Sequence, residues 1–206
     1  MYARSTTIHG DPGQLKDGIA YVRDEVMPTM LIIDGCIGLS MMVDRKAGRS
    51  IITTAWQDLA SMSSSDARVR PLRTRAGELF GGSPQVQMWE IAVLHRNEQA
   101  GEGACIRATW SRSDIDRTQQ AIDTYRMNLL PTMEGLPGFR SASLLVDRAS
   151  GEAVSSVTYS DSGALERSSK EAAALRRTAV KENDLEILEV AEFELIIAHL
   201  RVPETV

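Results

Sequence analysis

Pro28-Thr29-Met30 and Val43-Asp44-Arg45 recur as Pro131-Thr132-Met133 and Val146-Asp147-Arg148, each 103 residues further along the chain. With this offset the first 76 residues align without a gap, and nineteen positions are identical. Ordinary composition gives roughly one identity in sixteen by chance. The period is the size of a small domain and is too long for a solenoid repeat. The sequence therefore predicts two related folding units, which we expect to pack as a pseudo-symmetric pair.

The segment between the two repeats has the composition of a linker. Residues 97–103 contain two glycines and two glutamates, and no apolar periodicity crosses them. We therefore expect one domain over residues 1–97 and a second over residues 104–206.

Each repeat has the pattern of a short strand followed by a helix. Residues 2–8 and 105–110 alternate as strands do, and Asp11 and Asp114 are placed to begin the helices that follow. The helix of the first repeat has an apolar stripe at Leu15, Ile19, Val22, Val26 and Met30. Pro28 and its equivalent Pro131 predict that this helix ends or kinks there.

The second part of each repeat predicts a hairpin, a helix and a long last strand. Gly48 and Gly151 stand where a hairpin turn needs a left-handed residue, and the strands after them end at Trp56 and Tyr159. Asp58 and Asp161 are expected to cap the second helices. Pro71 is expected to split that helix in the first repeat only. The last strands cover about 85–96 and 186–200.

The order strand, helix, strand, strand, helix, strand is the split βαβ pattern of ferredoxin-like domains. The fold class is therefore α+β, with two tandem ferredoxin-like βαββαβ domains. In each, two helices cover one face of an antiparallel sheet, and the other face is left to meet the sheet of the second domain.

The second repeat also resembles a known family. Leu136-Pro137-Gly138-Phe139, Leu144-Leu145-Val146-Asp147-Arg148 and Ser156-Val157-Thr158-Tyr159 look like the antibiotic-biosynthesis-monooxygenase (ABM) family of the dimeric α+β barrel superfamily. In the first repeat, Asp34-Gly35-Cys36-Ile37 replaces the Pro-Gly-Phe entry to the second strand. The resemblance implies two tandem ABM-type domains that form an intramolecular dimeric α+β barrel, and it implies an oxidoreductase, a monooxygenase that uses no cofactor.

Composition limits the partners. The net charge of −5 and the pI near 5.3 argue against nucleic acid, which is bound by clustered Lys and Arg. No apolar run approaches the roughly 20 residues that span a membrane, and the polar start of the chain predicts no secretory signal. Cys36 and Cys105 are not equivalent, so neither a disulfide nor a metal site is indicated. We expect a cytoplasmic protein that binds a small molecule, and the sequence leaves a further homo-oligomer open.

Polar residues on the first strands are candidates for the site. Arg4 and Arg107 are equivalent, and each precedes by two positions a threonine, Thr6 or Thr109, that could contact substrate. The arginines have two interpretations. Either each forms a cross-strand ion pair with a glutamate of the last strand, Glu90 or Glu194, or each stabilises an enolate or carboxylate of a bound substrate.

Aromatic residues and histidines complete the candidate set. Trp56 and Tyr159 end equivalent strands and are candidates for substrate binding, with core packing as the alternative. His95 and His199 end the last strands and are candidates for a general base, with a structural strand-end role as the alternative.

The histidine that would hold haem iron is missing from the sequence. Haem-degrading members of the superfamily hold iron through a histidine of the second helix, but no histidine occurs between residues 57 and 84 or between 160 and 184. We therefore expect no haem bound in that way and no other cofactor or metal.

Three functions remain open. The ABM resemblance implies an oxygenase acting on a small aromatic or polyketide-like substrate, whose own carbanion reduces oxygen. The alternative is a non-catalytic ligand-binding or stress-associated protein with the same fold. An isomerase or lyase is the third.

Because Pro71 interrupts only one helix, we expect the larger pocket in the first repeat, lined by Trp56 with Arg4 as its cation. We also expect residues 104–206 alone to self-associate or to be much less stable than the whole chain.

Overall fold

The computed structural model describes residues 1–200 and 202–205, so two residues of the expected second domain, 201 and 206, lie outside it. The first half contains β1 (Tyr2–His9), α1 (Leu15–Tyr21), α2 (Met27–Leu31), β2 (Cys36–Asp44), β3 (Arg49–Trp56), α3 (Leu59–Ser64), α4 (Asp66–Phe80) and β4 (Pro84–Arg96). The second half repeats this order with β5 (Cys105–Arg112), α5 (Thr118–Thr124), α6 (Leu130–Glu134), β6 (Phe139–Asp147), β7 (Glu152–Tyr159), α7 (Ser162–Arg167), α8 (Ser169–Asn183) and β8 (Glu186–Leu200).

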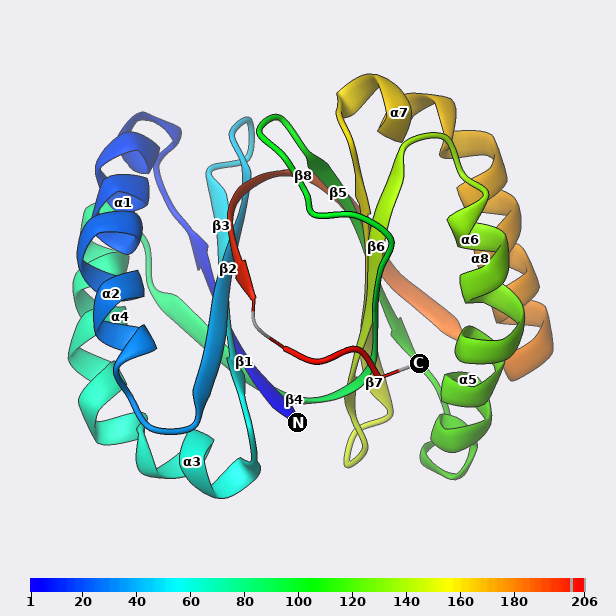
Figure 1. Ribbon diagram of the computed structural model, residues 1–206, viewed down its shortest axis with the longest axis horizontal. Coiled ribbons are helices and arrows are strands. Elements are labelled where there is room, and N and C mark those ends of the chain that lie inside the picture. Colours follow the sequence, from blue (N-terminus) through cyan, green and yellow to red (C-terminus); the bar gives the residue numbers. More distant parts are fainter. Residues whose placement is uncertain (201, 206) are drawn as a thin grey trace. The chain divides into compact units, whose positions relative to one another are not determined.

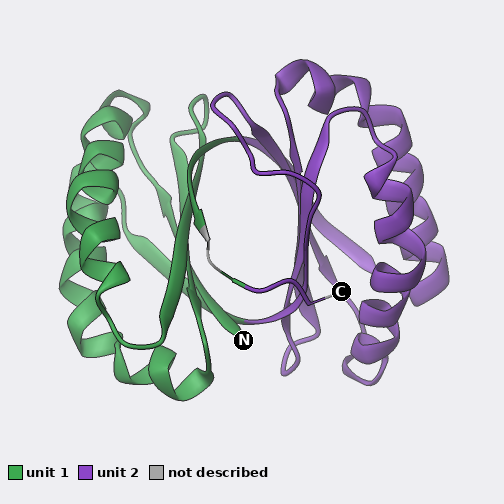
Figure 2. Ribbon diagram, viewed as in Figure 1, with its two compact units in different colours: residues 1–89, 194–202 green, residues 90–193, 203–206 purple. Residues whose placement is uncertain are grey.

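The chain forms two compact units, drawn in two colours in Figure 2. Unit 1 contains residues 1–89 and 194–202, and unit 2 contains residues 90–193 and 203–206. The last strand of each repeat therefore begins in the unit of its own repeat and ends in the other unit.

Unit 1 contains one sheet in the order β4-β1-β3-β2-β8, to which β4 contributes its first half and β8 its second half. The pairs β1 with β3, β2 with β3, and β2 with β8 are antiparallel. The helices of this unit cover one face of the sheet (Figure 1). They enclose a core that includes Ile8, Met41, Trp56 and Phe80.

Unit 2 repeats this arrangement in the order β8-β5-β7-β6-β4, with the first half of β8 and the second half of β4. Helices α5, α6 and α8 cover one face of its sheet (Figure 1). The predicted α+β class and the order strand, helix, strand, strand, helix, strand are confirmed. The face-to-face packing of the two domains stays a prediction.

The local signals for turns and for most helix starts are confirmed. The carboxylates of Asp58 and Asp161 each accept a backbone hydrogen bond 2.7 Å long at the start of α3 and α7. Gly48 and Gly151 have φ angles of 66° and 74°, in the left-handed region where glycine is favoured. Asp114 stands at the predicted helix start, but its side chain accepts no capping bond.

The predictions for the prolines have different outcomes. The sequence predicts that the first helix ends or kinks at Pro28; it does not end there but passes through a π turn over Val22–Val26 and continues to Leu31, and the kink stays a prediction. Pro71 lies inside α4, which runs unbroken through it, so the prediction that Pro71 splits the second helix is wrong. The break lies at Ser65 instead and recurs at Ser168 in the second repeat.

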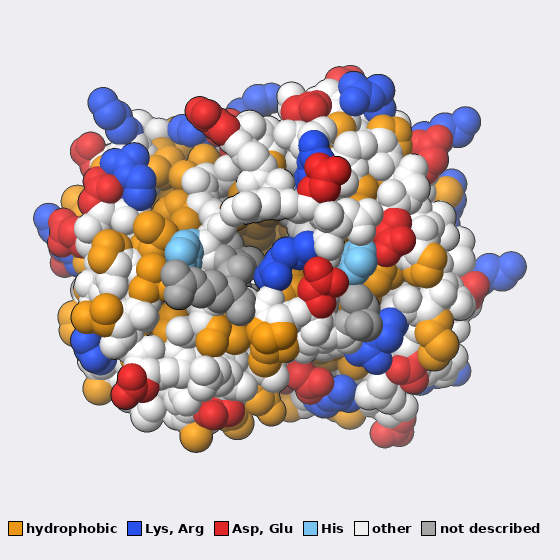
Figure 3. Space-filling view, in the orientation of Figure 1, with side chains coloured by type: hydrophobic (Ala, Val, Ile, Leu, Met, Phe, Trp, Pro, Cys, Tyr) orange, Lys and Arg blue, Asp and Glu red, His pale blue; other side chains and the backbone are white. Residues whose placement is uncertain are grey.

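Charged side chains of both signs are interspersed on the face of the molecule in Figure 3. Several form exposed ion pairs, such as Arg75 with Glu78 at 2.8 Å, which contribute little to stability. None of the helices in the described part of the chain is long and apolar enough to cross a membrane.

Candidate functional site

A buried arginine of the first strand binds the break in the second helix in each unit. Arg107 donates to Ser168 Oγ at 2.9 Å and to the Leu165 carbonyl at 2.8 Å. Its equivalent, Arg4, donates to Ser65 Oγ at 3.1 Å and to the carbonyl of Met62. We call these the helix-break contacts. They satisfy carbonyl groups that the interrupted helix leaves without an intrahelical partner.

The predicted aromatic residues lie beneath these arginines. The guanidinium carbon of Arg4 is 5.7 Å from the centre of the Trp56 ring, and that of Arg107 is 5.6 Å from the Tyr159 ring. Both distances suit a cation–π contact. Trp56 is fully buried, and its Nε1 donates to Thr54 Oγ1 at 3.0 Å. Trp56 therefore packs in the core.

The predicted cross-strand pairs with Glu90 and Glu194 are wrong. Glu90 pairs with Arg148 at 2.6 Å, and Glu194 pairs with Arg45 at 2.7 Å. The reason is the strand order: the second half of β4 lies beside β6, so Glu90 stands opposite Val146 and near the hairpin that carries Arg148.

Each first-strand arginine has a different acid nearby. Arg107 bonds to Glu192 at 2.8 Å, whereas Arg4 lies 4.0 Å from Asp66. Hydrogen bonds from Arg70 and Arg73 to Asp66 lower the pKa of its carboxyl to about 2.

One cavity lies in unit 2, between the sheet and the helices. Its volume is about 90 Å³, whereas the equivalent space in unit 1 is about 30 Å³. The prediction of a larger pocket in the first repeat is therefore wrong. The helix containing Pro71 stays intact, and the bulky Trp56 does not line the smaller cavity.

Smaller or more polar side chains open the space in unit 2. Residues at equivalent positions, 103 apart, change from apolar in unit 1 to polar in unit 2 at Ile8 and Ser111, Ile52 and Ser155, and Phe80 and Asn183. The last exchange is coupled to another. A Cβ on Gly18 would lie 2.3 Å from the Phe80 ring, and the residue equivalent to Gly18 is Ala121. A phenylalanine therefore does not fit at position 183.

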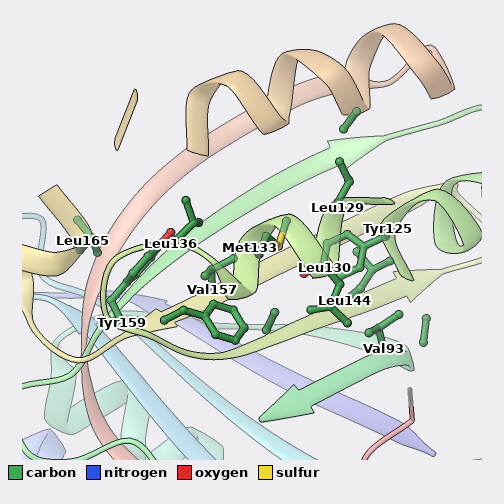
Figure 4. Close-up of a cluster of buried hydrophobic side chains, with 14 of the residues drawn as sticks. Val93, Tyr125, Leu129, Leu130, Met133, Leu136, Leu144, Val157, Tyr159 and Leu165 are labelled. Carbon is green, nitrogen blue, oxygen red and sulfur yellow. The ribbon is translucent and has the colours of Figure 1, made fainter. Parts of the chain in front are cut away.

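The wall of the larger cavity is mainly hydrocarbon. Figure 4 shows the buried cluster to which these side chains belong: the Tyr125 ring lies near Leu129 and Leu144, and Tyr159 lies toward the other end, beside Leu136. Such a wall binds the apolar part of a ligand, while a few polar groups orient it.

Polar groups of this wall have partners within the protein. The Tyr125 hydroxyl donates to the Ser143 carbonyl at 3.3 Å and lies 3.1 Å from Ser155 Oγ. Burial raises the pKa of Tyr125 to about 12, so its hydroxyl is neutral and can donate a hydrogen bond at physiological pH. Thr124 donates to Asn183 Oδ1 at 3.0 Å.

The cavities bring together only some of the residues predicted from the sequence. Arg107, Thr109 and Tyr159 line the larger cavity, and Arg4 and Thr6 line the smaller one. Three predicted residues line neither: Trp56, His95 and His199.

His95 lies in a different environment at the end of β4. Its Nε2 is 2.8 Å from Glu134 and its Nδ1 is 3.4 Å from Glu204, and its ring stacks on Phe139 with centroids 6.3 Å apart. His199, at the end of β8, pairs through its backbone with Leu39. The assignment of either histidine as a base stays a prediction.

The lining residues that were not predicted to have a role include Tyr125, Ser155, Arg176 and Asn183. A comparison of the two repeats in the sequence could have identified these residues. Val22, Ile52 and Phe80 are the apolar equivalents of three of them, so a comparison of the two repeats by position shows where unit 2 gains polar groups.

The cavity supplies cations and neutral donors. Its described lining includes two arginines and two tyrosines, with no carboxylate and no imidazole. Within the described residues, no cluster of three His, Cys, Asp or Glu side chains could hold a metal ion. A reaction that begins by removing a proton therefore lacks an evident base among these lining groups.

The whole chain is similar to proteins of Mycobacterium tuberculosis. Rv2557 and Rv2558, both uncharacterized, are each 50% identical to it over 206 and 207 residues. The alignments cover all of this chain and 92% and 88% of those proteins. No protein-family model matches the chain.

Solved structures with little sequence similarity share its fold. A proposed monooxygenase of Fusobacterium nucleatum has a TM-score of 0.70 and 14% identity, over 94% of this chain and 90% of that one. A proposed monooxygenase of Lactobacillus acidophilus has a TM-score of 0.68 and 10% identity, over 94% and 92%. An anthrone oxidase-like protein has a TM-score of 0.68 and 12% identity, over 94% and 90%. The chain thus has the α+β fold of monooxygenase-like proteins.

Proposed function

The chain belongs to the family of the mycobacterial proteins Rv2557 and Rv2558, and we propose that it binds a small, largely apolar molecule in the cavity of unit 2. One observation carries this proposal: polar, hydrogen-bonded side chains in unit 2 replace the apolar residues that fill the same space in unit 1. A structural core alone gains nothing from that exchange, because buried polar groups stabilise less than the apolar packing they replace.

The volume of the cavity limits the size of the ligand. An apolar cavity of about 150 Å³ admits benzene, so a cavity of about 90 Å³ has room for a group of only a few heavy atoms. Pockets for drug-sized ligands measure roughly 300–1,000 Å³. We therefore expect short branched or single-ring compounds, with the flexible Met133 in the wall moving to admit the larger ones.

Methionine methyl groups report binding in each unit. Met133 lines the cavity of unit 2, and its equivalent Met30 lines the smaller one of unit 1. In protein labelled with ¹³C at the methionine methyls, titration with isobutanol and phenol is expected to shift the Met133 signal and leave Met30 unchanged. Met133→Leu and Met30→Leu assign the two signals.

A matched pair of variants tests the location. Ser155→Ile places the residue of unit 1 in the wall of the cavity and is expected to abolish the shifts. Ser156→Ile, at the next position of β7, points to the other face of the sheet and is expected to leave them intact. Shifts that persist in Ser155→Ile, or the absence of any shift, would reject the cavity as a binding site.

A second candidate is a cofactor-independent monooxygenase, which the fold shared with the anthrone oxidase-like protein favours. Because the described lining holds no carboxylate or imidazole, this function requires a substrate that enters already ionised, with Arg176 beside its charge. Oxygen uptake with anthrone-like and quinol substrates, measured between pH 6 and 10, tests it. Uptake that rises with ionisation of the substrate and is lost in Ser155→Ile supports the oxygenase, and no uptake above the protein-free rate rejects it.

A further inference from the structure

Two arginines line the cavity of unit 2, and they differ in how their charge is balanced. Arg107 is almost completely buried and bonds to Ser168, Ser169, Leu165 and Glu192. The N–H donors of its guanidinium are therefore all directed at groups of the protein itself. It holds the helix break and has no donor directed at a ligand.

Arg176 on α8 is half-buried, and its guanidinium forms no hydrogen bond or ion pair within residues 1–200 and 202–205. Glu192 is near enough to influence it electrostatically, but the Glu192 carboxylate is bound to Arg107. Burial, and then repulsion from Arg107, lower the pKa of Arg176. A guanidinium nevertheless stays charged at neutral pH, so a cation without a direct partner borders the cavity.

The equivalent arginine in unit 1 has the partner that Arg176 lacks. Arg73 lines the smaller cavity and bonds to Asp66 at 2.6 Å. The position equivalent to Asp66 is Ser169 in unit 2, and this serine accepts a hydrogen bond from Arg107 at 2.8 Å. Because serine stands at position 169 where unit 1 has Asp66, Arg176 lacks the carboxylate partner that neutralises Arg73.

We propose that the cavity of unit 2 selects a small apolar carboxylic acid, whose carboxylate Arg176 binds while its hydrocarbon part lies among Leu129, Met133 and Leu144. This inference rests on the proposed function, and it names the ligand class of the same cavity. An arginine fork matches the two oxygens of a carboxylate, and a charge-assisted bond is stronger in a partly dehydrated site than in water. Arg176 lines the cavity and is partly exposed to solvent, so its guanidinium is accessible to a charged ligand.

The test compares an acid with a neutral compound of the same shape. Isobutyrate and isobutyramide, or benzoate and benzamide, are titrated at pH 7 while the Met133 methyl signal is followed. We expect each acid to bind at least about tenfold more tightly than its amide, as a charged hydrogen bond gives.

Three variants locate the preference. Arg176→Gln is expected to reduce acid binding to the level of the amide and to leave amide binding unchanged. Ser169→Asp restores the partner that Arg73 has in unit 1, and it is expected to do the same without removing the arginine. Arg177→Gln removes an exposed neighbouring charge and is expected to change neither.

Each result supports or overturns the inference. Equal binding of acid and amide by the unmodified protein, or a preference that survives both Arg176→Gln and Ser169→Asp, overturns it while leaving the cavity as a binding site. If no compound, charged or neutral, shifts Met133, the proposed function fails and the inference fails with it. The unchanged Met30 signal and an unchanged circular dichroism spectrum show that each variant is folded.

Discussion

The helix-break contact of unit 2 is expected to be a major source of stability, and Arg107→Met tests this. Methionine keeps much of the length of the side chain but cannot donate hydrogen bonds. The substitution removes the buried bonds to Ser168 Oγ and to the Leu165 carbonyl, and it removes the cation from the Tyr159 ring. It also removes the part-buried bonds to Ser169 Oγ and Glu192, which are more accessible to solvent.

The expected loss in the free energy of unfolding follows from these contacts. Two bonds from a charged donor to buried neutral acceptors contribute about 1.5 kcal/mol each, and the ring contact adds about 0.5–1 kcal/mol. The variant no longer desolvates a guanidinium, which offsets part of the loss. We therefore expect the free energy of unfolding to fall by about 2–4 kcal/mol, which for a chain of this size lowers Tm by roughly 5–10 °C.

Equilibrium unfolding in urea, followed by circular dichroism, measures the change. Arg112→Met is the matched control, because Arg112 lies on the same strand and its ion pairs with Glu152 and Glu186 are partly exposed to solvent. The control is expected to change stability by less than about 0.5 kcal/mol. If Arg107→Met loses less than about 1 kcal/mol, the buried arginine does not hold the helix break.

Three further results are expected. Because arginine contacts lower the pKa of Asp66 from its usual 3.8 to about 2, its ionised form contributes stability that is present above pH 4 and is lost as the pH falls toward 2. Asp66→Asn should therefore flatten the acid unfolding profile in that window, and an unchanged profile would contradict this. Gly138 has a φ of 69°, and a Cβ there would lie 2.5 Å from the Ala164 Cβ. Gly138→Ala should thus cost about 1–3 kcal/mol in a urea titration, whereas Gly135→Ala, with its nearest contact at 3.5 Å, should be almost neutral. Burial raises the pKa of the Cys36 thiol, so it should react with a disulfide reagent far more slowly in native than in unfolded protein, and equal rates would be inconsistent with that burial.

The features that could be predicted from the sequence are those that depend on neighbouring residues. Asp58 and Asp161 cap helices through backbone groups three positions away, and Gly48 and Gly151 adopt the turn conformation that glycine favours. Such signals lie within a few residues of where they act, so reading the chain locally recovers them, and with them the order of helices and strands.

The failed predictions concern contacts between distant segments. The second helix breaks at Ser65 and not at Pro71, and Arg4, 61 residues away, binds at this break. The partner of Glu90 depends on β4 lying beside β6, which no local pattern reveals. The size of a cavity depends on side chains from many segments at once, so Pro71 alone was an unreliable guide to it.

A comparison between the repeats carries information that neither repeat carries alone. The helix-break arginine and serine are retained in both units, whereas the side chains between sheet and helices differ. If the polar residues of unit 2 were only tolerated there, some should lack hydrogen-bond partners, because a buried unpaired group costs about 1–3 kcal/mol. Instead Tyr125, Ser155 and Asn183 all have partners. Arg176 is retained from unit 1 and borders the cavity, and within the described residues its guanidinium forms no hydrogen bond or ion pair. The exchanges therefore place hydrogen-bonded polar groups in a mainly apolar wall, beside a charge that we propose binds a ligand.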